Sequence, residues 1–225
     1  MSKGEIRCVD LVKTYNPGKP NQCHALNGVN LTISIGNYVS IIGPSGSGKS
    51  TLLNMISCLD TPTKGEVYIE DVGISKLNGL QKARLRREKL GFIFQQFNLI
   101  PTMSAFENVE LPMRFKGIPY NERKKRVADI LELVELSDKK HNRPSQMSGG
   151  QQQRVAVARS LANDPQIIMA DEPTGNLDQK TGNLIMDLLK RLNKEEGKTL
   201  VVVTHDQKIA KNAPRTIKMV DGKIV

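Results

Sequence analysis

The sequence lacks tryptophan and has few other aromatic residues, 4 Tyr and 5 Phe in 225 residues, and these rings do not interleave with basic residues. Single-stranded nucleic acids are commonly bound by stacking their bases on aromatic rings, so that mode of binding is disfavoured. The three cysteines lie far apart and form no C-x-x-C pair, which favours reduced thiols over disulfides or a zinc site.

Long apolar runs are also missing. No stretch approaches the roughly 18 apolar residues that a membrane-spanning helix needs, so we expect no direct membrane insertion. Residues 1–5 carry no hydrophobic leader, and we therefore expect the chain to stay in the cytosol.

What the sequence has in excess is positive charge, with a formal net charge of +10. Basic residues cluster at 82–89, 123–126 and 139–143. These clusters fit solvated helix surfaces that also offset bound phosphate charge, or a surface near anionic lipid headgroups, or a nucleic-acid site. We favour the first interpretation and rank the lipid surface second, so that no nucleic-acid partner is expected.

Residues 43–50, Gly-Pro-Ser-Gly-Ser-Gly-Lys-Ser, fit the phosphate-binding pattern G-x-x-x-x-G-K-[ST]. An apolar strand at 39–42 precedes them and a helix at 51–56 follows, which is the context that supports the motif. The glycines allow the backbone to approach an anion, Lys49 would lie between the β- and γ-phosphates, and Ser50 would bind Mg²⁺. The expected nucleotide contacts are Gly43, Pro44, Ser45, Gly46, Ser47, Gly48, Lys49, Ser50 and Thr51.

Two carboxylates, Asp171 and Glu172, follow a buried strand at 167–170. Ligands bind at the carboxyl ends of strands in open α/β sheets. We therefore expect Asp171 to hold Mg²⁺ and Glu172 to act as the general base or to orient the attacking water. Residues 193–196, Asn-Lys-Glu-Glu, are similar to a guanine-reading N-K-x-D motif, but they end in Glu and belong to a helix surface.

The order of patterns predicts the fold class. Short strands at 6–12, 26–35 and 66–69 come first, and residues 80–160 are mostly helical. Gapless apolar strands at 167–170 and 200–203 then flank an amphipathic helix, which indicates a parallel sheet covered on both faces. We expect an α/β P-loop NTPase with a mostly parallel central sheet, an N-terminal antiparallel β-subdomain and an inserted α-helical subdomain.

Residues 148–151, Ser-Gly-Gly-Gln, are open to two interpretations. Ser148 and Gln151 fit a helix capping box. However, Gly149 and Gly150 would then lie in the first helical turn, where glycine is less favourable than alanine by up to about 1 kcal/mol. A second anion-binding helix N-terminus explains them better, and it would serve a nucleotide held by another copy of the chain.

With these motifs in this order, the sequence resembles the ATP-binding-cassette (ABC) ATPases over essentially its whole length, as one domain spanning 1–225. The resemblance implies a nucleotide-binding lobe at 1–94 and 165–225, and a helical subdomain at 95–164. Ser148–Gln151 match the family's signature loop, although Met147 stands where leucine is commoner. Further matches are Gln95, which contacts Mg²⁺ and senses the transmembrane partner, Asp178 at the dimer interface, His205 on the γ-phosphate, and Tyr15 on adenine.

The resemblance implies that ATP and Mg²⁺ are bound between two copies placed head to tail, between residues 43–51 of one chain and 148–151 of the other. Glu172, His205 and Gln95 would carry out hydrolysis. Closure of the dimer would push on a separate permease subunit, so the chain would work at the cytoplasmic face of the membrane. Phe97, Leu99 and Ile100 either line the docking groove for that permease or are buried helical residues.

Residues 94–101 and 107–112 are similar to the ATPase subunits of lipoprotein-releasing and macrolide-export systems. This branch implies export or mechanical transmission. The main alternative is the ATPase of a small-molecule importer. A soluble ABC-type ATPase that acts on nucleic acid is a rival of another class, although the coiled coil, zinc motifs or second cassette typical of that class are not found in the sequence.

Overall fold

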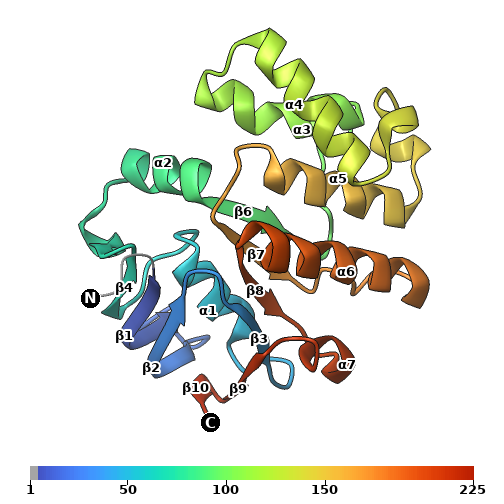
Figure 1. The fold of residues 1–225 in the computed structure, drawn as a ribbon. Helices are drawn as coiled ribbons and strands as arrows, with labels where there is room; N and C mark the ends of the chain where they lie inside the picture. The colour runs from blue at the N-terminus through green and yellow to red at the C-terminus, as the bar shows by residue number, and fades with distance from the viewer. Residues whose placement is uncertain (1–4) are drawn as a thin grey trace.

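The computed structural model describes residues 5–225, so the expectation about a leader falls almost entirely outside the described residues. Two sheets form the framework (Figure 1). The antiparallel sheet has the order β2-β1-β4-β5, with β1 at Glu5–Tyr15, β2 at Cys23–Ser34, β4 at Lys64–Ile69 and β5 at Val72–Gly73. The six-stranded sheet has the order β10-β9-β3-β8-β7-β6, with β3 at Tyr38–Ile42, β6 at Leu90–Ile93, β7 at Ile167–Asp171, β8 at Thr199–Val203, β9 at Arg215–Val220 and β10 at Lys223–Ile224.

The central sheet is parallel from β9 through β6, and β10 pairs with β9 antiparallel. Its apolar strands serve two hydrophobic cores, because successive side chains of a strand point to opposite faces. Met169 of β7 and Val201 of β8 belong to one core, whereas their neighbours Ala170 and Val202 belong to the other. The predicted parallel sheet with both faces covered is therefore confirmed.

Helices cover the two faces in separate groups (Figure 1). Helix α1 (Lys49–Ile56) packs into the core that the central sheet shares with the antiparallel sheet. On the other face lie α3 (Ala105–Lys116), α4 (Tyr120–Leu133), α5 (Gly149–Leu161) and α6 (Gln179–Glu196). The helix α2 (Gly79–Lys89) has no buried residue, and α7 (Gln207–Ala210) is a single short turn. The predicted helical insert between the strands is thus present.

Local sequence signals fix several helix ends. The Ser104 hydroxyl accepts a hydrogen bond from the Glu107 backbone N–H, and the Glu107 carboxylate accepts one from the Ser104 backbone N–H, which confirms the capping box at the start of α3. Helix α6 ends at Gly197, whose φ is +66°. The segment 193–196 forms the last turn of this helix, so its interpretation as helix surface is confirmed.

The sequence patterns did not reveal β9 and β10, and they made β1 shorter than it is. Strand β9 alternates buried Ile217 and Met219 with exposed Arg215, Thr216 and Lys218, which weakens any apolar signal. Among residues 5–225, none of the helices combines the length and the apolar character needed to cross a membrane.

Candidate functional site

The phosphate loop, defined here as residues 43–51, connects β3 to α1. Gly46 and Gly48 have φ values of +78° and +94°, in the left-handed region that favours glycine. A Cβ on Gly43 would lie 2.2 Å from the Met219 carbonyl oxygen, and one on Gly48 would lie 2.4 Å from the Ala25 carbonyl oxygen. The loop therefore lies so close to β9 and β2 that these two positions have room only for glycine.

Positive charge collects inside this loop. Lys49 is only 9% exposed, and its ammonium donates to the carbonyl oxygens of Gly43 and Pro44, both at 2.9 Å. No carboxylate pairs with it among residues 5–225. The N-terminus of α1 adds the positive end of the helix dipole at the same place. The buried hydroxyl of Ser47 has no hydrogen-bond partner in the described part of the chain. An anion with several acceptor oxygens, such as a polyphosphate, fits this arrangement.

Asp171, the last residue of β7, lies beside the phosphate loop. The Ser50 hydroxyl donates to the Asp171 carboxylate at 3.3 Å. The pKa of Asp171 is raised above its usual value. Burial is the largest cause, and the charge of Glu172 adds to it, whereas the Ser50 hydrogen bond and the charge of Lys49 act in the opposite direction. A hydroxyl and a carboxylate next to a phosphate site fit Mg²⁺, which takes few protein oxygens and keeps several waters.

Glu172 has an unusual backbone and a firmly held side chain. Its φ of +47° is uncommon for a residue other than glycine. One carboxylate oxygen accepts from the backbone N–H of His205 at 2.9 Å and lies 2.8 Å from His205 Nδ1. Because a carboxylate only accepts, we assign the proton of the ring to Nδ1. The other oxygen accepts from the hydroxyl of Thr204 at 3.2 Å, a contact that the sequence did not predict.

Gln95, which follows β6, meets the segment that follows β7. A Cβ on Gly175 would lie 2.8 Å from the Gln95 side-chain nitrogen, so the glycine makes room for the glutamine. The Asn176 side chain donates to the Gln95 carbonyl oxygen at 2.9 Å. Asp178 caps α6, where it accepts from the backbone N–H of Thr181 at 3.0 Å and from its hydroxyl at 2.6 Å. These hydrogen bonds hold the pKa of Asp178 below its usual value.

Tyr15 ends β1 next to the phosphate loop. Its hydroxyl donates to Asp60 at 3.1 Å, and Thr51, the last residue of the loop, lies close enough to influence its pKa. The pKa of Tyr15 is raised above its usual value, chiefly by burial and also by Asp60, while the neighbouring Thr51 acts in the opposite direction. The structure thus brings together Tyr15 and Thr51, two of the residues predicted to contact the nucleotide.

The signature loop, residues 148–151, begins α5. Its Ser148 hydroxyl accepts from the Gln151 backbone N–H at 3.3 Å, and the Gln151 side-chain oxygen accepts from the Ser148 backbone N–H at 2.9 Å. The capping-box interpretation therefore describes the contacts that are present. Within residues 5–225, no hydrogen bond or ion pair joins this loop to the phosphate loop, since α5 and α1 pack on opposite faces of the central sheet.

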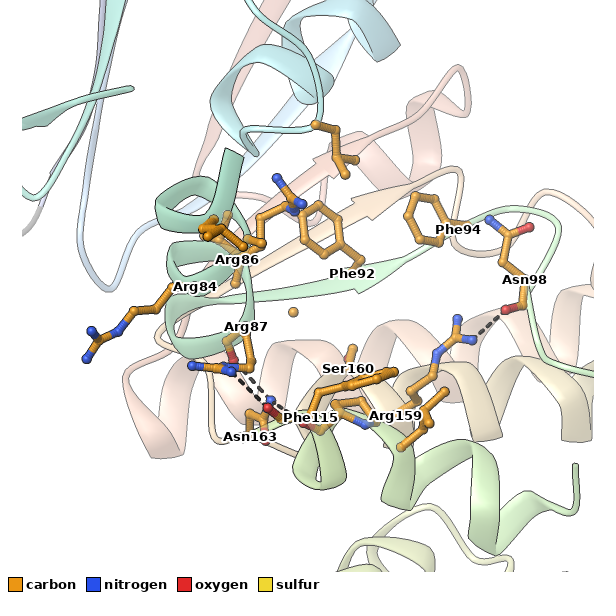
Figure 2. A pocket seen from close by; sticks show the side chains of 17 residues that line it. Arg84, Arg86, Arg87, Phe92, Phe94, Asn98, Phe115, Arg159, Ser160 and Asn163 are labelled. Atoms are coloured by element: carbon orange, nitrogen blue, oxygen red, sulfur yellow. Dashed lines mark hydrogen bonds between the residues drawn. The ribbon is translucent and has the colours of Figure 1, made fainter. Parts of the chain in front are cut away.

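A groove of about 850 Å³ lies beside β6 and is mostly apolar (Figure 2). Phe92 of β6 and Phe94, the residue directly after this strand, lie on one side, with stacked rings whose centres are 5.8 Å apart, and Phe115 lies on the opposite side. The residues that line it are Leu59, Leu80, Ala83, Arg84, Arg86, Arg87, Leu90, Gly91, Phe92, Phe94, Asn98, Leu111, Pro112, Phe115, Arg159, Ser160 and Asn163.

The three residues considered for a docking groove in the sequence are not among those that line this one. Phe97, Leu99 and Ile100 are half-buried, and Leu99 packs against the core of the helical face. The basic cluster at 82–89 lies on α2, and three of its arginines line the groove.

A polyphosphate cradle after β3 and a pair of carboxylates at the end of β7, with β8 between these two parallel strands, define a class, the P-loop nucleotide-binding proteins. The family within the class follows from comparison with known proteins. The family model for ABC transporters matches residues 26–175, and the chain belongs to this family as an ATP-binding cassette.

The relatives match nearly the whole of this chain. It is 54% identical over 223 residues to the ABC transporter ATP-binding protein MJ0796 of Methanocaldococcus jannaschii, which is 97% of this chain and 94% of the relative. It is 47% identical over 220 residues to the macrolide export ATP-binding/permease protein MacB of Hyphomonas neptunium. That match takes in 98% of this chain but only 34% of MacB, and it agrees with the likeness to the macrolide-export branch.

The solved structures agree with the fold. The dimeric structure of a post-hydrolysis state of the ATP-binding cassette MJ0796, bound to ADP and Pi, has a TM-score of 0.91 at 52% identity and covers 97% of this chain and 96% of that chain. The structure of cbiO1 from Clostridium perfringens, part of the ABC transporter complex cbiONQ, has a TM-score of 0.88 at 29% identity, with 100% of this chain and 88% of that chain covered.

Proposed function

We propose that the chain is the ATP-hydrolysing subunit of a membrane transporter. It works as a homodimer whose two copies are brought together by ATP binding. The observation that carries this proposal is the Glu172 carboxylate, which His205 and Thr204 hold next to the pair formed by Ser50 and Asp171. A fixed base beside a phosphate loop and a magnesium-binding pair is the arrangement that phosphoryl transfer to water requires.

In this proposal each part of the site has a task. Backbone N–H groups of residues 43–51 and the Lys49 ammonium bind the phosphates, and Tyr15 stacks on adenine. Ser50, Asp171 and Gln95 would hold Mg²⁺, which would supply positive charge to offset the negative charge of the phosphate oxygens.

Hydrolysis then needs a base and correct orientation. Glu172 takes a proton from water as the water oxygen bonds to the γ-phosphorus, while the bond from that phosphorus to the oxygen bridging it to the β-phosphate breaks and ADP leaves. His205 and Gln95 hold the γ-phosphate and the water in line. The Nδ1–H of His205, donated to Glu172, fixes the orientation of the imidazole ring.

A second copy supplies the signature loop. Among residues 5–225 of one molecule, no hydrogen bond or ion pair joins the signature loop to the phosphate loop, so the signature loop is free to reach a nucleotide bound to another copy. The dimeric MJ0796 structure with ADP and Pi supports this arrangement. We assign the signature loop to a helical subdomain at 95–164 and the phosphate loop to the lobe formed by 1–94 and 165–225, with Asp178 at the dimer interface.

The substitution Glu172→Gln tests the catalytic part of the proposal. It should retain ATP binding and lower the turnover number by about 10²–10⁴-fold, because the phosphate and magnesium contacts remain while the base is lost. Phosphate release and nucleotide titration measure the two effects separately. Glu195→Gln, at an exposed position near the end of α6, is the control and should change neither. Undiminished hydrolysis by Glu172→Gln would remove Glu172 from its role.

We also propose that the groove beside β6 receives a cytoplasmic segment of a permease, which places the chain at the cytoplasmic face of the membrane. Leu80 and Phe115, two apolar residues of the groove, are 84% and 69% exposed. Arg86 and Arg159 donate to the carbonyl oxygens of Cys58 and Phe97, both at 2.8 Å, and form no ion pair with the described residues. A short helix with an apolar face and flanking carboxylates fits this surface.

The groove proposal is tested with Leu80→Asp, which places a charge on the apolar wall. We expect this variant to hydrolyse ATP but to lose a polytopic membrane protein that co-purifies with the wild-type chain from detergent-extracted membranes. Leu184→Asp, at an equally apolar but 52% exposed position on α6, should retain that protein. Retention by both variants would exclude the groove as the docking site.

Likeness to MacB supports export or mechanical transmission as the direction of work. The alternative functions remain an ATPase of a small-molecule importer and, from another class, a soluble ATPase that acts on nucleic acid. A nucleic-acid affinity that falls steeply with salt, together with no membrane protein in the purified complex, would favour the last of these.

A further inference from the structure

We propose that Asp60, together with Lys13, is a positioning residue for the base of ATP, because it fixes the ring of Tyr15 on which the base stacks. This inference rests on the proposed function, which assigns Tyr15 to the adenine. Neither Asp60 nor Lys13 belongs to a motif of the sequence, and both act through Tyr15 rather than by touching the nucleotide.

Asp60 lies in the segment between α1 and β4, where both of its carboxylate oxygens are used. One oxygen accepts from the Lys13 ammonium at 2.8 Å and from the Thr61 backbone N–H at 2.6 Å. The other accepts from the Tyr15 hydroxyl at 3.1 Å. Lys13 also donates to the Thr61 carbonyl oxygen at 2.8 Å, and its side chain is only 12% exposed. The end of β1 is thereby tied to the segment that follows the phosphate-loop helix.

This network decides which face of the ring is open. The Lys13 ammonium lies 4.8 Å from the centre of the Tyr15 ring, where it makes a cation–π contact with one face. A base can then stack only on the other face. Tyr15 is the last residue of β1, and residues 16–22 beyond it are exposed, so the hydrogen bond to Asp60 is what holds the phenol end of the ring.

The network also links the base to the phosphates. Thr51 belongs to α1, the helix that begins at Lys49, and Asp60 follows the same helix a few residues later. The surface for the base and the cradle for the phosphates are therefore fixed to one element. A nucleotide that binds both meets a site whose two parts are already at a set spacing, which reduces the cost of ordering them on binding.

The test compares a ligand that has a base with one that lacks it. Affinities of the full chain for ATP and for inorganic tripolyphosphate are measured by calorimetry with Mg²⁺. Asp60→Asn should weaken ATP binding about 5-fold, since the variant loses part of the stacking of the base on Tyr15, and should leave tripolyphosphate binding unchanged. Tyr15→Phe, which keeps the ring and removes only its hydroxyl, should show the same selective loss.

Two controls bracket the result. Lys49→Ala should weaken both ligands, because it removes a phosphate contact. Glu70→Gln, which breaks a comparable ion pair with Lys89 at 3.0 Å, should weaken neither. An equal loss of both ligands in Asp60→Asn and in Tyr15→Phe would overturn the proposal, since Asp60 would then only support α1. Unchanged ATP affinity in both variants would also overturn it. Wild-type protein that binds neither ligand would overturn the proposed function and this inference with it.

Discussion

At the scale of single residues, two adjacent carboxylates acquire different chemistry from their surroundings. Asp171 ends a buried strand and shares a hydrogen bond with Ser50, which suits a group that binds a cation. Glu172 comes one residue later, but its left-handed backbone and its bond from the backbone N–H to the Val203 carbonyl oxygen bring its carboxylate to His205. The roles that we propose for the two residues, Asp171 as metal ligand and Glu172 as base, thus follow from one backbone turn.

Asp60 allows a prediction on acid stability. Burial raises its pKa, but the hydrogen bonds from Lys13, Thr61 and Tyr15 lower it more, so that the pKa in the folded chain lies below its usual value of 3.8. A carboxyl whose pKa is lowered by folding stabilises the fold above its unfolded pKa, and loses that contribution as the pH falls through its folded pKa. Its stabilisation is therefore fully present at neutral pH.

Urea unfolding of the wild type and Asp60→Asn at several pH values measures this contribution. The difference in their free energies of unfolding should be constant above about pH 5 and should shrink as the pH falls toward about 3. The reason is that protonated Asp60 no longer accepts from the Lys13 ammonium as a charged partner. A difference that grows on acidification would contradict the assignment of these hydrogen bonds.

At the scale of elements, the residues at the start of α5 have two roles, since they cap the helix and also pack against α6. Ser148 and Gln151 cap the helix, and Gly150 lies where α5 meets α6. A Cβ on Gly150 would lie 2.5 Å from the Thr181 methyl group, whereas one on Gly149 would come no closer than 3.7 Å to Phe97. Close packing of α5 against α6 therefore requires glycine at position 150, whereas packing gives no reason for glycine at position 149.

Gly150→Ala should destabilise the chain by about 1–3 kcal/mol, because the new methyl group overpacks the contact between α5 and α6. Gly149→Ala is the matched control and should be neutral or slightly stabilising, since alanine favours a helix over glycine. Chemical unfolding measures both. Adding Thr181→Ser, which removes the crowded methyl group, should restore most of the loss. Equal stability of the two single variants would show that the close approach to Thr181 has no energetic weight.

The sequence predicted the elements whose signals are local. The phosphate loop, the apolar strands β7 and β8, and the capping box at Ser104 depend on residues near one another in the chain. Strand β9 was not predicted, because its exposed polar side chains alternate with buried apolar ones and weaken the apolar signal. The bond between Tyr15 and Asp60 joins residues 45 positions apart in the sequence, and no periodicity or motif marks such a pair. Packing between distant segments, such as that of Gln95 on Gly175, is likewise not predicted by any short sequence pattern.

At the scale of the whole molecule, the central sheet separates the two halves of the proposed catalytic site. The phosphate loop precedes α1 on one face, whereas the signature loop begins α5 on the other. Two copies placed head to tail would bring each half to its complement, with the same pair of surfaces used twice. A dimer of this kind places the nucleotide in the interface, so that its binding energy stabilises the closed pair.

Mixing two inactive variants tests this arrangement. Lys49→Ala disables the phosphate loop, and Ser148→Arg disables the signature loop, so neither variant alone can form a working site. Equal amounts of both form mixed dimers in which one of the two sites combines an intact phosphate loop with an intact signature loop. ATP hydrolysis should therefore return to at most about a quarter of the wild-type rate, by random pairing in a two-fold dimer. Phosphate release before and after mixing measures it. A mixture no more active than its components, or a wild-type rate per chain that does not fall on dilution, would mean that each chain holds a complete site.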